Sequence, residues 1–118
     1  MTNPQLLLVE DDPDLLAVLR LTLQREGYET VEARDGEEAL RLARRHAPDL
    51  VVLDVMLPKL DGIEVCRQLR ADRALQKVVV LMLTARAEES DVVLGLGVGA
   101  DDYVCKPARR SSSSERRR

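Results

Sequence analysis

Two apolar segments of this chain each run directly into acidic residues. Residues 50–53 are four consecutive aliphatic residues that end at Asp54, and the mostly apolar run 5–9 ends at Glu10 and Asp11. A short run that is apolar on both faces is typical of a buried strand in a parallel sheet. Because ligands bind beyond the carboxyl ends of such strands, we expect the three carboxylates to meet at one edge of the sheet.

Two further strand ends would add a hydroxyl and an amine to this edge. The apolar run 78–83 ends at Thr84, and the run 103–105 ends at Lys106. Three adjacent carboxylates repel one another, which favours a bound cation, and hard oxygen ligands without histidine or cysteine favour Mg²⁺. These groups together suit phosphoryl transfer onto a carboxylate. Asp54 would be the nucleophile, while Mg²⁺ and Lys106 would neutralise the phosphoryl oxygens.

The segments between these strands have the pattern of amphipathic helices. Asp12, Asp35 and Asp61 each stand just before a segment whose apolar residues recur at helical spacing. Aspartate is a favourable N-cap residue, so we assign these three to helix capping. The alternation of strand and helix predicts a parallel α/β sheet with right-handed crossovers. The expected strands are residues 5–9, 28–33, 50–54, 78–83 and 103–105, and the last expected helix spans about 88–98.

The composition indicates a soluble single domain. The 118 residues are 45% hydrophobic and 33% charged, and their longest apolar runs are far shorter than the about 20 residues that span a bilayer. No basic and apolar leader follows Met1, so we expect a cytoplasmic protein without a membrane segment. Cys66 and Cys105 are far apart and lack a paired motif, which favours two buried, reduced thiols.

Charge is distributed unevenly along the chain. The formal net charge is −3, but residues 109–118 hold five of the 18 basic residues and only one of the 21 acidic residues. The body of the chain is therefore acidic and its tail is basic. This distribution argues against direct nucleic-acid binding by the domain itself.

Several short motifs follow one another along the chain. They are Leu8-Val9-Glu10-Asp11-Asp12, Leu53-Asp54-Val55-Met56-Leu57-Pro58 with Asp61-Gly62, Leu83-Thr84-Ala85, Tyr103, and Lys106-Pro107. Their order resembles the receiver domain of bacterial two-component response regulators, over about residues 5–107. The segments 55–62 and 99–103 are most similar to receivers that precede a winged-helix DNA-binding domain. The resemblance implies a flavodoxin-like, doubly wound five-stranded sheet of order 2-1-3-4-5, phosphorylation by a sensor histidine kinase, and control of transcription through an output domain outside this chain.

The resemblance also assigns roles to the residues at the expected sheet edge. Asp54 corresponds to the phospho-acceptor, Asp11 to a direct metal ligand, and Glu10 to an acid that acts on the metal through water. The backbone carbonyl of Met56 would complete the protein ligands of the Mg²⁺ ion. The chain would then catalyse only its own phosphotransfer and slow autodephosphorylation, and would not be an enzyme acting on other substrates.

Three residues on the later strands correspond to groups that respond to phosphorylation. Lys106 matches the phosphate-binding lysine, Thr84 the switch hydroxyl that moves onto the phosphoryl group, and Tyr103 the aromatic residue that turns inward behind it. From the residues alone, a lesser alternative is that Thr84 caps the following helix. Tyr103 can likewise be a passive aromatic residue at the sheet edge.

The end of the chain departs from the family pattern. The family continues with an aromatic residue and a fifth amphipathic helix, whereas residues 108–118 contain only Arg, Ser and Glu apart from one alanine. We therefore expect a receiver domain over 1–107, a basic tail or linker over 108–118, and a fifth helix that is absent or degenerate. The apolar area left beside Val104 and the apolar residues of 92–96 would favour a homodimer.

Two other functions stay open at this point. A receiver-like interaction scaffold would keep the fold without switching, as loss of the fifth helix would allow. An aspartyl-phosphate hydrolase would turn over small phosphoesters, but such enzymes usually place the nucleophile and a second acid two residues apart after the first strand. Here Asp12 and Asp14 flank Pro13 in a helix start, which fits poorly. A phosphorylation-controlled receiver is therefore the function we predict.

Overall fold

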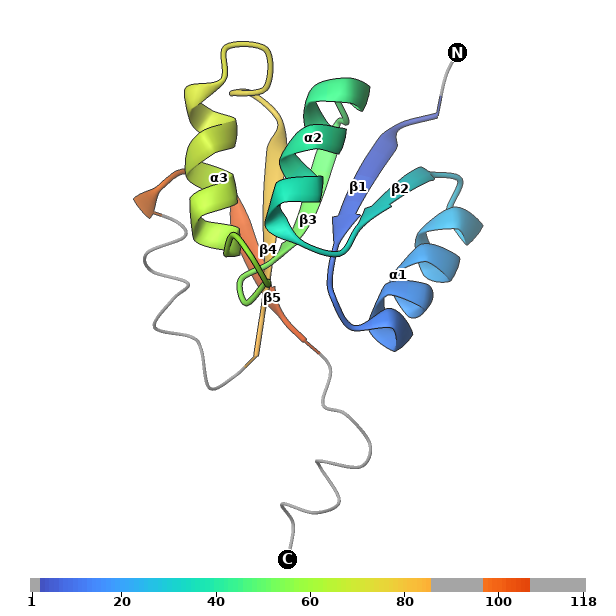
Figure 1. The fold of residues 1–118 in the computed structure, drawn as a ribbon. Helices are drawn as coiled ribbons and strands as arrows, with labels where there is room; N and C mark the ends of the chain where they lie inside the picture. Colours follow the sequence, from blue (N-terminus) through green and yellow to red (C-terminus); the bar gives the residue numbers. More distant parts are fainter. Residues whose placement is uncertain (1–2, 86–96, 107–118) are drawn as a thin grey trace, which may run out of the picture.

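One five-stranded parallel sheet forms the centre of the computed structural model, which describes residues 3–85 and 97–106 (Figure 1). The strand order is β2-β1-β3-β4-β5, which confirms the predicted flavodoxin-like topology. Along the chain, the elements are β1 (Gln5–Val9), α1 (Pro13–Arg25), β2 (Glu29–Ala33), α2 (Gly36–His46), β3 (Leu50–Asp54), α3 (Gly62–Ala71), β4 (Val79–Thr84) and β5 (Asp102–Cys105).

The strand boundaries agree with the predicted ones to within one residue. β4 begins one residue later than expected because the Val78 amide donates to the Leu75 carbonyl at 3.0 Å and closes a turn. The expected helix over about 88–98 lies almost entirely outside the described residues, and so does the whole tail over 108–118. Within the two described ranges, no helix is long and apolar enough to cross a membrane.

The three predicted capping aspartates are N-caps in the structure. Asp12 accepts hydrogen bonds from two amides of the first turn of α1, Asp35 accepts from the Glu38 amide at 2.8 Å, and Asp61 accepts from the Glu64 amide at 2.9 Å. Each bond satisfies an amide that has no partner within its helix, and typically contributes about 1 kcal/mol. α1 and α2 therefore begin within four residues of the ends of β1 and β2, whereas seven residues separate β3 from α3.

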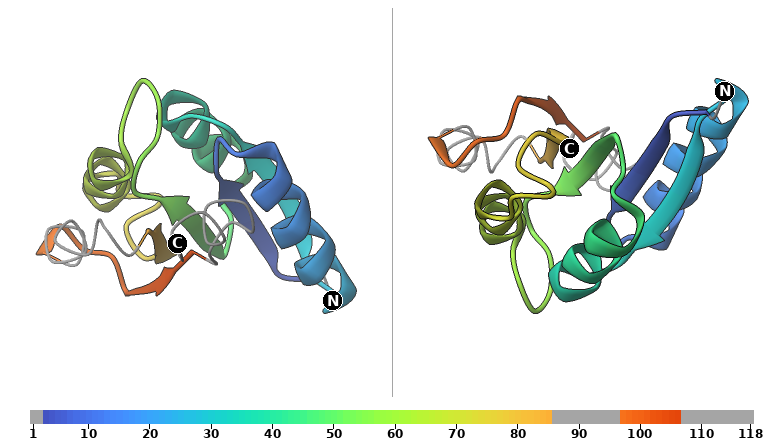
Figure 2. Two further views of the ribbon diagram at one scale, coloured as in Figure 1. Left: turned by 90° about the horizontal axis from the view of Figure 1, so that it is seen from below. Right: turned by 90° about the horizontal axis from the view of Figure 1, so that it is seen from above.

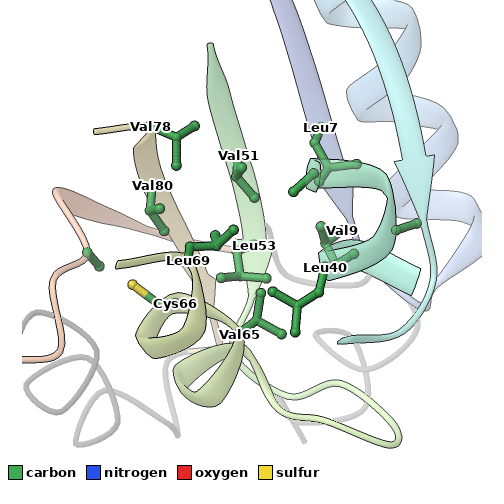
Figure 3. Packing of buried hydrophobic residues seen from close by; sticks show 14 of the residues in the cluster. Leu7, Val9, Leu40, Val51, Leu53, Val65, Cys66, Leu69, Val78 and Val80 are labelled. Carbon is green, nitrogen blue, oxygen red and sulfur yellow. The ribbon is translucent and has the colours of Figure 1, made fainter. Parts of the chain in front are cut away.

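Helices cover both faces of the sheet (Figure 2), as the term doubly wound requires. Side chains alternate along each strand, so neighbouring residues belong to opposite layers. The larger layer lies between the sheet and the pair α2 and α3, as Figure 3 shows; it includes Leu7, Val9, Leu40, Val51, Leu53, Val65, Leu69 and Val80. The smaller layer lies under α1 and consists of Leu6, Leu8, Leu16, Val52 and Leu83, with Leu19, Leu23, Leu50 and Leu81 packed against it.

The two cysteines have different environments. Cys66 on α3 is buried in the larger layer, as predicted, whereas Cys105 on β5 is exposed, so the expectation of a buried thiol is wrong for Cys105. The reason is the position of β5 at the edge of the sheet, where all four of its residues are exposed.

Candidate functional site

Three carboxylates gather at the carboxyl ends of β1 and β3. These strands are direct neighbours, with Val9 paired to Leu53, so Glu10 and Asp11 emerge beside Asp54. One oxygen from each of the three acids lies within 4.8 Å of the others. Glu10 and Asp54 are buried, and Asp11 is exposed. The structure therefore brings together the three acids that the sequence placed at one edge.

Lys106 adds a positive charge to this cluster from the end of β5. Its Nζ donates a hydrogen bond to Asp54 Oδ2 at 2.9 Å and lies 3.2 Å from Glu10 Oε1. Burial acts to lower the pKa of Lys106, but the hydrogen bond to Asp54 and the charges of Asp54 and Glu10 outweigh it and raise that pKa. Lys106 is therefore protonated at every physiological pH and partly neutralises the acids.

Glu10 is the most constrained of the three acids. Its side chain is 0% exposed; Oε2 accepts from the Asp12 amide at 3.0 Å, but Oε1 has no hydrogen-bond partner because Lys106 is close without the geometry of a hydrogen bond. Burial, opposed by the bond from Asp12 and reinforced by the charge of Asp54, raises the pKa of Glu10 to about 7. Buried oxygens normally accept a hydrogen bond, so Oε1 of Glu10 is a position where the site can bind a cation or another hydrogen-bond donor.

The donor set fits a hard divalent cation. It offers carboxylate oxygens and no nitrogen or sulfur, and its negative charge exceeds the single charge of Lys106. Mg²⁺ prefers such oxygens and keeps several of its own waters, so an open site with one exposed acid, Asp11, suits it. Oε1 of Glu10, which accepts no hydrogen bond, could then accept from a water on the ion.

We predict that Glu10→Gln stabilises the metal-free chain at pH 8 by about 1 kcal/mol, because the amide removes a buried charge. Because the pKa of Glu10 is raised from 4.5 to about 7 in the folded chain, its charged form lowers the free energy of unfolding by the full amount above pH 7. This destabilisation disappears as the pH falls toward 4.5, where the folded chain has Glu10 protonated. The gain should therefore shrink at pH 5. Urea unfolding at both pH values measures it, and a variant that is less stable than the parent at pH 8 would contradict the prediction.

The backbone around Asp54 is held by the loop that follows β3. The amide of Val55 donates to the Leu83 carbonyl at 3.0 Å, and the amide of Gly62 donates to the Val55 carbonyl at 2.9 Å. A Cβ atom at Gly62 would lie only 2.2 Å from the Asp54 carbonyl oxygen, so the turn requires glycine there. The amide of Met56 donates to Asp54 Oδ1 at 3.1 Å, which orients the carboxylate.

Thr84 and Tyr103 lie at different distances from the centre of the cluster. Thr84 ends β4, one residue beyond the partner of Asp54, and its buried hydroxyl donates to the Ala85 carbonyl at 3.0 Å. Tyr103 on β5 pairs with Met82 and is 38% exposed. The structure thus places Thr84 beside the acids and Tyr103 farther back along the sheet edge.

Sequence reasoning missed two of the contacts that shape this site. It gave no role to the amide of Met56 or to the close approach of Gly62 to Asp54, although both residues lie in a quoted motif. Only the Asp61-Gly62 pair could have indicated the close approach of Gly62, since a capping acid followed by glycine is typical of a tight helix start.

Comparisons with known proteins identify similar sequences over nearly all of the chain. Residues 6–116 match the family described as response regulator receiver domain. The alkaline phosphatase synthesis transcriptional regulatory protein PhoP of Bacillus subtilis is 54% identical over 105 residues, which are 89% of this chain and 43% of PhoP. The DNA-binding response regulator MtrA of Mycolicibacterium smegmatis is 52% identical over 103 residues, 87% of this chain and 44% of MtrA. The chain thus spans less than half the length of these relatives.

Two solved structures, of a putative response regulator and of a receiver domain, are also similar to this chain. A putative response regulator from Chloroflexus aurantiacus has a TM-score of 0.86 and 36% identity, covering 98% of this chain and 94% of that one. The receiver domain of the sensor histidine kinase PA1611 from Pseudomonas aeruginosa has a TM-score of 0.83 and 34% identity, covering 97% of this chain and 93% of that one. That structure has a magnesium ion coordinated in its active site cleft.

Proposed function

Since the chain belongs to the response regulator receiver domain family and is a signalling domain controlled by phosphorylation, we propose that Asp54 is the residue that accepts the phosphoryl group. The observation that carries this proposal is the environment of Asp54. It is a buried carboxylate at a strand end, with a lysine 2.9 Å away and two further acids next to it. We further propose that a sensor histidine kinase supplies the phosphoryl group.

In the proposed reaction, Asp54 attacks the phosphorus atom of a phosphohistidine. A bond forms between a carboxylate oxygen of Asp54 and phosphorus, and the bond between phosphorus and the histidine nitrogen breaks. The Met56 amide, which already donates to Oδ1, orients the carboxylate. Lys106 is protonated beside Oδ2, so its ammonium is in place to pair with the incoming phosphoryl oxygens.

We assign the metal ligands to the three acids and one carbonyl. Asp11, Asp54 and the backbone carbonyl of Met56 would hold Mg²⁺ directly, and Glu10 would act through a water; the charge and position of the acids support this assignment. When bound, Mg²⁺ neutralises phosphoryl oxygens during transfer. The chain would otherwise catalyse only the slow loss of its own phosphoryl group.

Thr84 and Tyr103 are the residues we propose to transmit the signal. The Thr84 hydroxyl now donates to a neighbouring carbonyl, and a phosphoryl group on Asp54 would offer it a charged acceptor, which makes a stronger hydrogen bond. Movement of Thr84 would leave space toward which the partly exposed Tyr103 can turn. We propose that an output domain reads this change and makes any DNA contacts. This proposal is supported by the names of the relatives, since PhoP is named a transcriptional regulatory protein and MtrA a DNA-binding response regulator.

Incubation with a small phosphodonor, such as phosphoramidate, and Mg²⁺ tests the proposal. We expect one alkali-labile phosphoryl group per chain, seen as a single mass increase. Continuous release of phosphate at many turnovers would instead indicate a hydrolase, and the absence of any label would indicate a scaffold that does not switch. Either of these results would overturn the proposed function.

We also propose that the chain self-associates through the sheet face that carries Val104. Val79 and Val104 lie on the same face as Leu83, and they are 44% and 47% exposed. Burying such area contributes about 25 cal/mol per Å². The residues 92–96 expected to extend this patch lie outside the described part of the chain.

Sedimentation equilibrium over a wide concentration range measures this association. We expect the average mass to rise toward that of a dimer, and Val79→Ser combined with Val104→Ser to weaken association by removing apolar area. Val18→Ser, at an exposed valine on α1, is the matched control and should leave association unchanged. A chain that remains monomeric at the highest concentration would refute the proposed interface.

A further inference from the structure

Arg70, near the end of α3, makes four hydrogen bonds to segments outside its helix, two of them about 30 residues away in sequence. Its guanidinium donates to the carbonyls of Gln76 at 2.9 Å, Val78 at 2.6 Å and Gly99 at 2.8 Å, and to Asp101 Oδ2 at 2.8 Å. The arginine side chain is 21% exposed. One side chain therefore ties α3 to the turn before β4 and to the segment that leads into β5.

Asp101 extends this connection into the sheet. Its Oδ2 also accepts from the Val80 amide at 2.7 Å, and its own amide donates to the Val80 carbonyl at 2.9 Å. Gly99 has φ +113°, and a Cβ atom there would lie 2.8 Å from Arg70 Cγ, so the chain turns closely beneath the arginine. The start of β5 is thus fixed by a hydrogen-bonded cluster of Arg70, Gly99, Asp101 and Val80.

Apart from its ladder with β4, β5 is held mainly at its two ends, because its side chains contribute little burial. All four of its residues are exposed, and in the sheet it pairs only with β4, at the edge. At its far end, the Lys106 amide donates to the Thr84 carbonyl at 2.7 Å. Four extended residues span only about 13 Å, so a shift at Asp101 is passed directly to Lys106.

We propose that Arg70 is a positioning residue for Lys106. It holds the start of β5 and thereby sets where the Lys106 ammonium lies relative to Asp54. Arg70 itself does not contact the acidic cluster of Glu10, Asp11 and Asp54. This inference rests on the proposed phosphorylation of Asp54. The proposed metal ligands come from β1, β3 and the loop after β3, so loosening β5 should impair capture of a phosphoryl group while leaving metal binding intact.

The test compares Arg70→Gln with Arg67→Gln. Arg67 lies on the same helix and forms an exposed ion pair with Glu64, so its variant controls for the loss of one surface cation. Two affinities are measured on the folded chain: that for Mg²⁺ alone, and that for beryllofluoride, a phosphoryl mimic, at saturating Mg²⁺. For Arg70→Gln we expect beryllofluoride to bind about tenfold more weakly. Its Mg²⁺ affinity should be equal or higher, because a cation beside the acids has loosened.

Hydrogen exchange gives a readout that does not depend on phosphorylation. Amides of residues 102–105 should exchange faster in Arg70→Gln, while those of β1 and β3 stay protected. Arg70→Lys keeps the charge but cannot reach all four acceptors, so it should give an intermediate value. If Arg70→Gln fails to fold, Asp101→Asn, which can still accept from the Val80 amide, should show the same division between the two affinities.

Three results would overturn the inference. They are unchanged beryllofluoride affinity in Arg70→Gln, an equal loss in Arg67→Gln, and a parallel loss of Mg²⁺ affinity that indicates general loosening. A parent chain that binds no beryllofluoride would instead contradict the proposed function, and exchange at β5 would still decide whether Arg70 anchors the strand.

Discussion

Asp54→Asn should abolish labelling of the chain by a phosphodonor. Asparagine has nearly the same shape and can still accept from the Met56 amide, but its amide is not a nucleophile toward phosphorus. The other acids of the cluster do not compensate, because Glu10 is buried with a raised pKa and Asp11 lacks the lysine contact that Asp54 makes. Intact-mass spectrometry after treatment with phosphoramidate and Mg²⁺ measures the effect.

A suitable control is Asp35→Asn. Asp35 caps α2 and is also an aspartate after a strand, and asparagine is an equally good N-cap, so this variant should keep both its fold and its label. Labelling that persists in Asp54→Asn would show that the phosphoryl group is carried by another residue. Loss of labelling in both variants would indicate a general effect of removing charge near the sheet edge.

Asp11→Ala should remove measurable Mg²⁺ binding. Asp11 is the exposed acid of the cluster, and without it the proposed direct ligands are reduced to Asp54 and one backbone carbonyl. Mg²⁺ does not shed its waters readily, so it needs the carboxylates to stay in the site. In the parent chain, Mg²⁺ should also raise the melting temperature, because it binds the folded state only, and this rise should be absent in the variant.

Asp14→Ala is the matched control for this experiment. Asp14 is exposed in the first turn of α1, three residues from Asp11, so its removal changes the net charge equally without touching the cluster. Calorimetric titration of both variants gives the comparison. Equal Mg²⁺ affinity in Asp11→Ala and the parent chain would move the metal site elsewhere.

The parts of the fold that the sequence predicted correctly depend on local patterns. The run 50–53 is apolar on both faces, and only a strand covered by helices on both sides buries such a run. The capping roles of Asp12, Asp35 and Asp61 follow equally from neighbouring residues. Because parallel strands align their carboxyl ends, these local assignments were sufficient to bring Glu10, Asp11 and Asp54 together.

Other features depend on contacts that no local pattern encodes. Cys105 lies in an apolar-looking segment, but its strand is at the edge of the sheet and the thiol is exposed. Three of the four acceptors of Arg70 are backbone carbonyls, and the carbonyl of Gly99 is 29 residues away in sequence. Every residue has a carbonyl, so no residue type in the sequence identifies these acceptors. The environment of Glu10, buried with one oxygen that accepts no hydrogen bond, likewise requires the packed structure.

The most direct test of the central claim is to locate the phosphoryl group in the unaltered chain. Borohydride reduces an aspartyl phosphate to homoserine, which tandem mass spectrometry assigns to a single position after digestion. After treatment with phosphoramidate and Mg²⁺, we expect homoserine at position 54 and nowhere else in the chain. Homoserine at another acid, or a chain that gains a phosphoryl group without any reducible aspartate, would contradict the assignment of Asp54 as the phospho-acceptor.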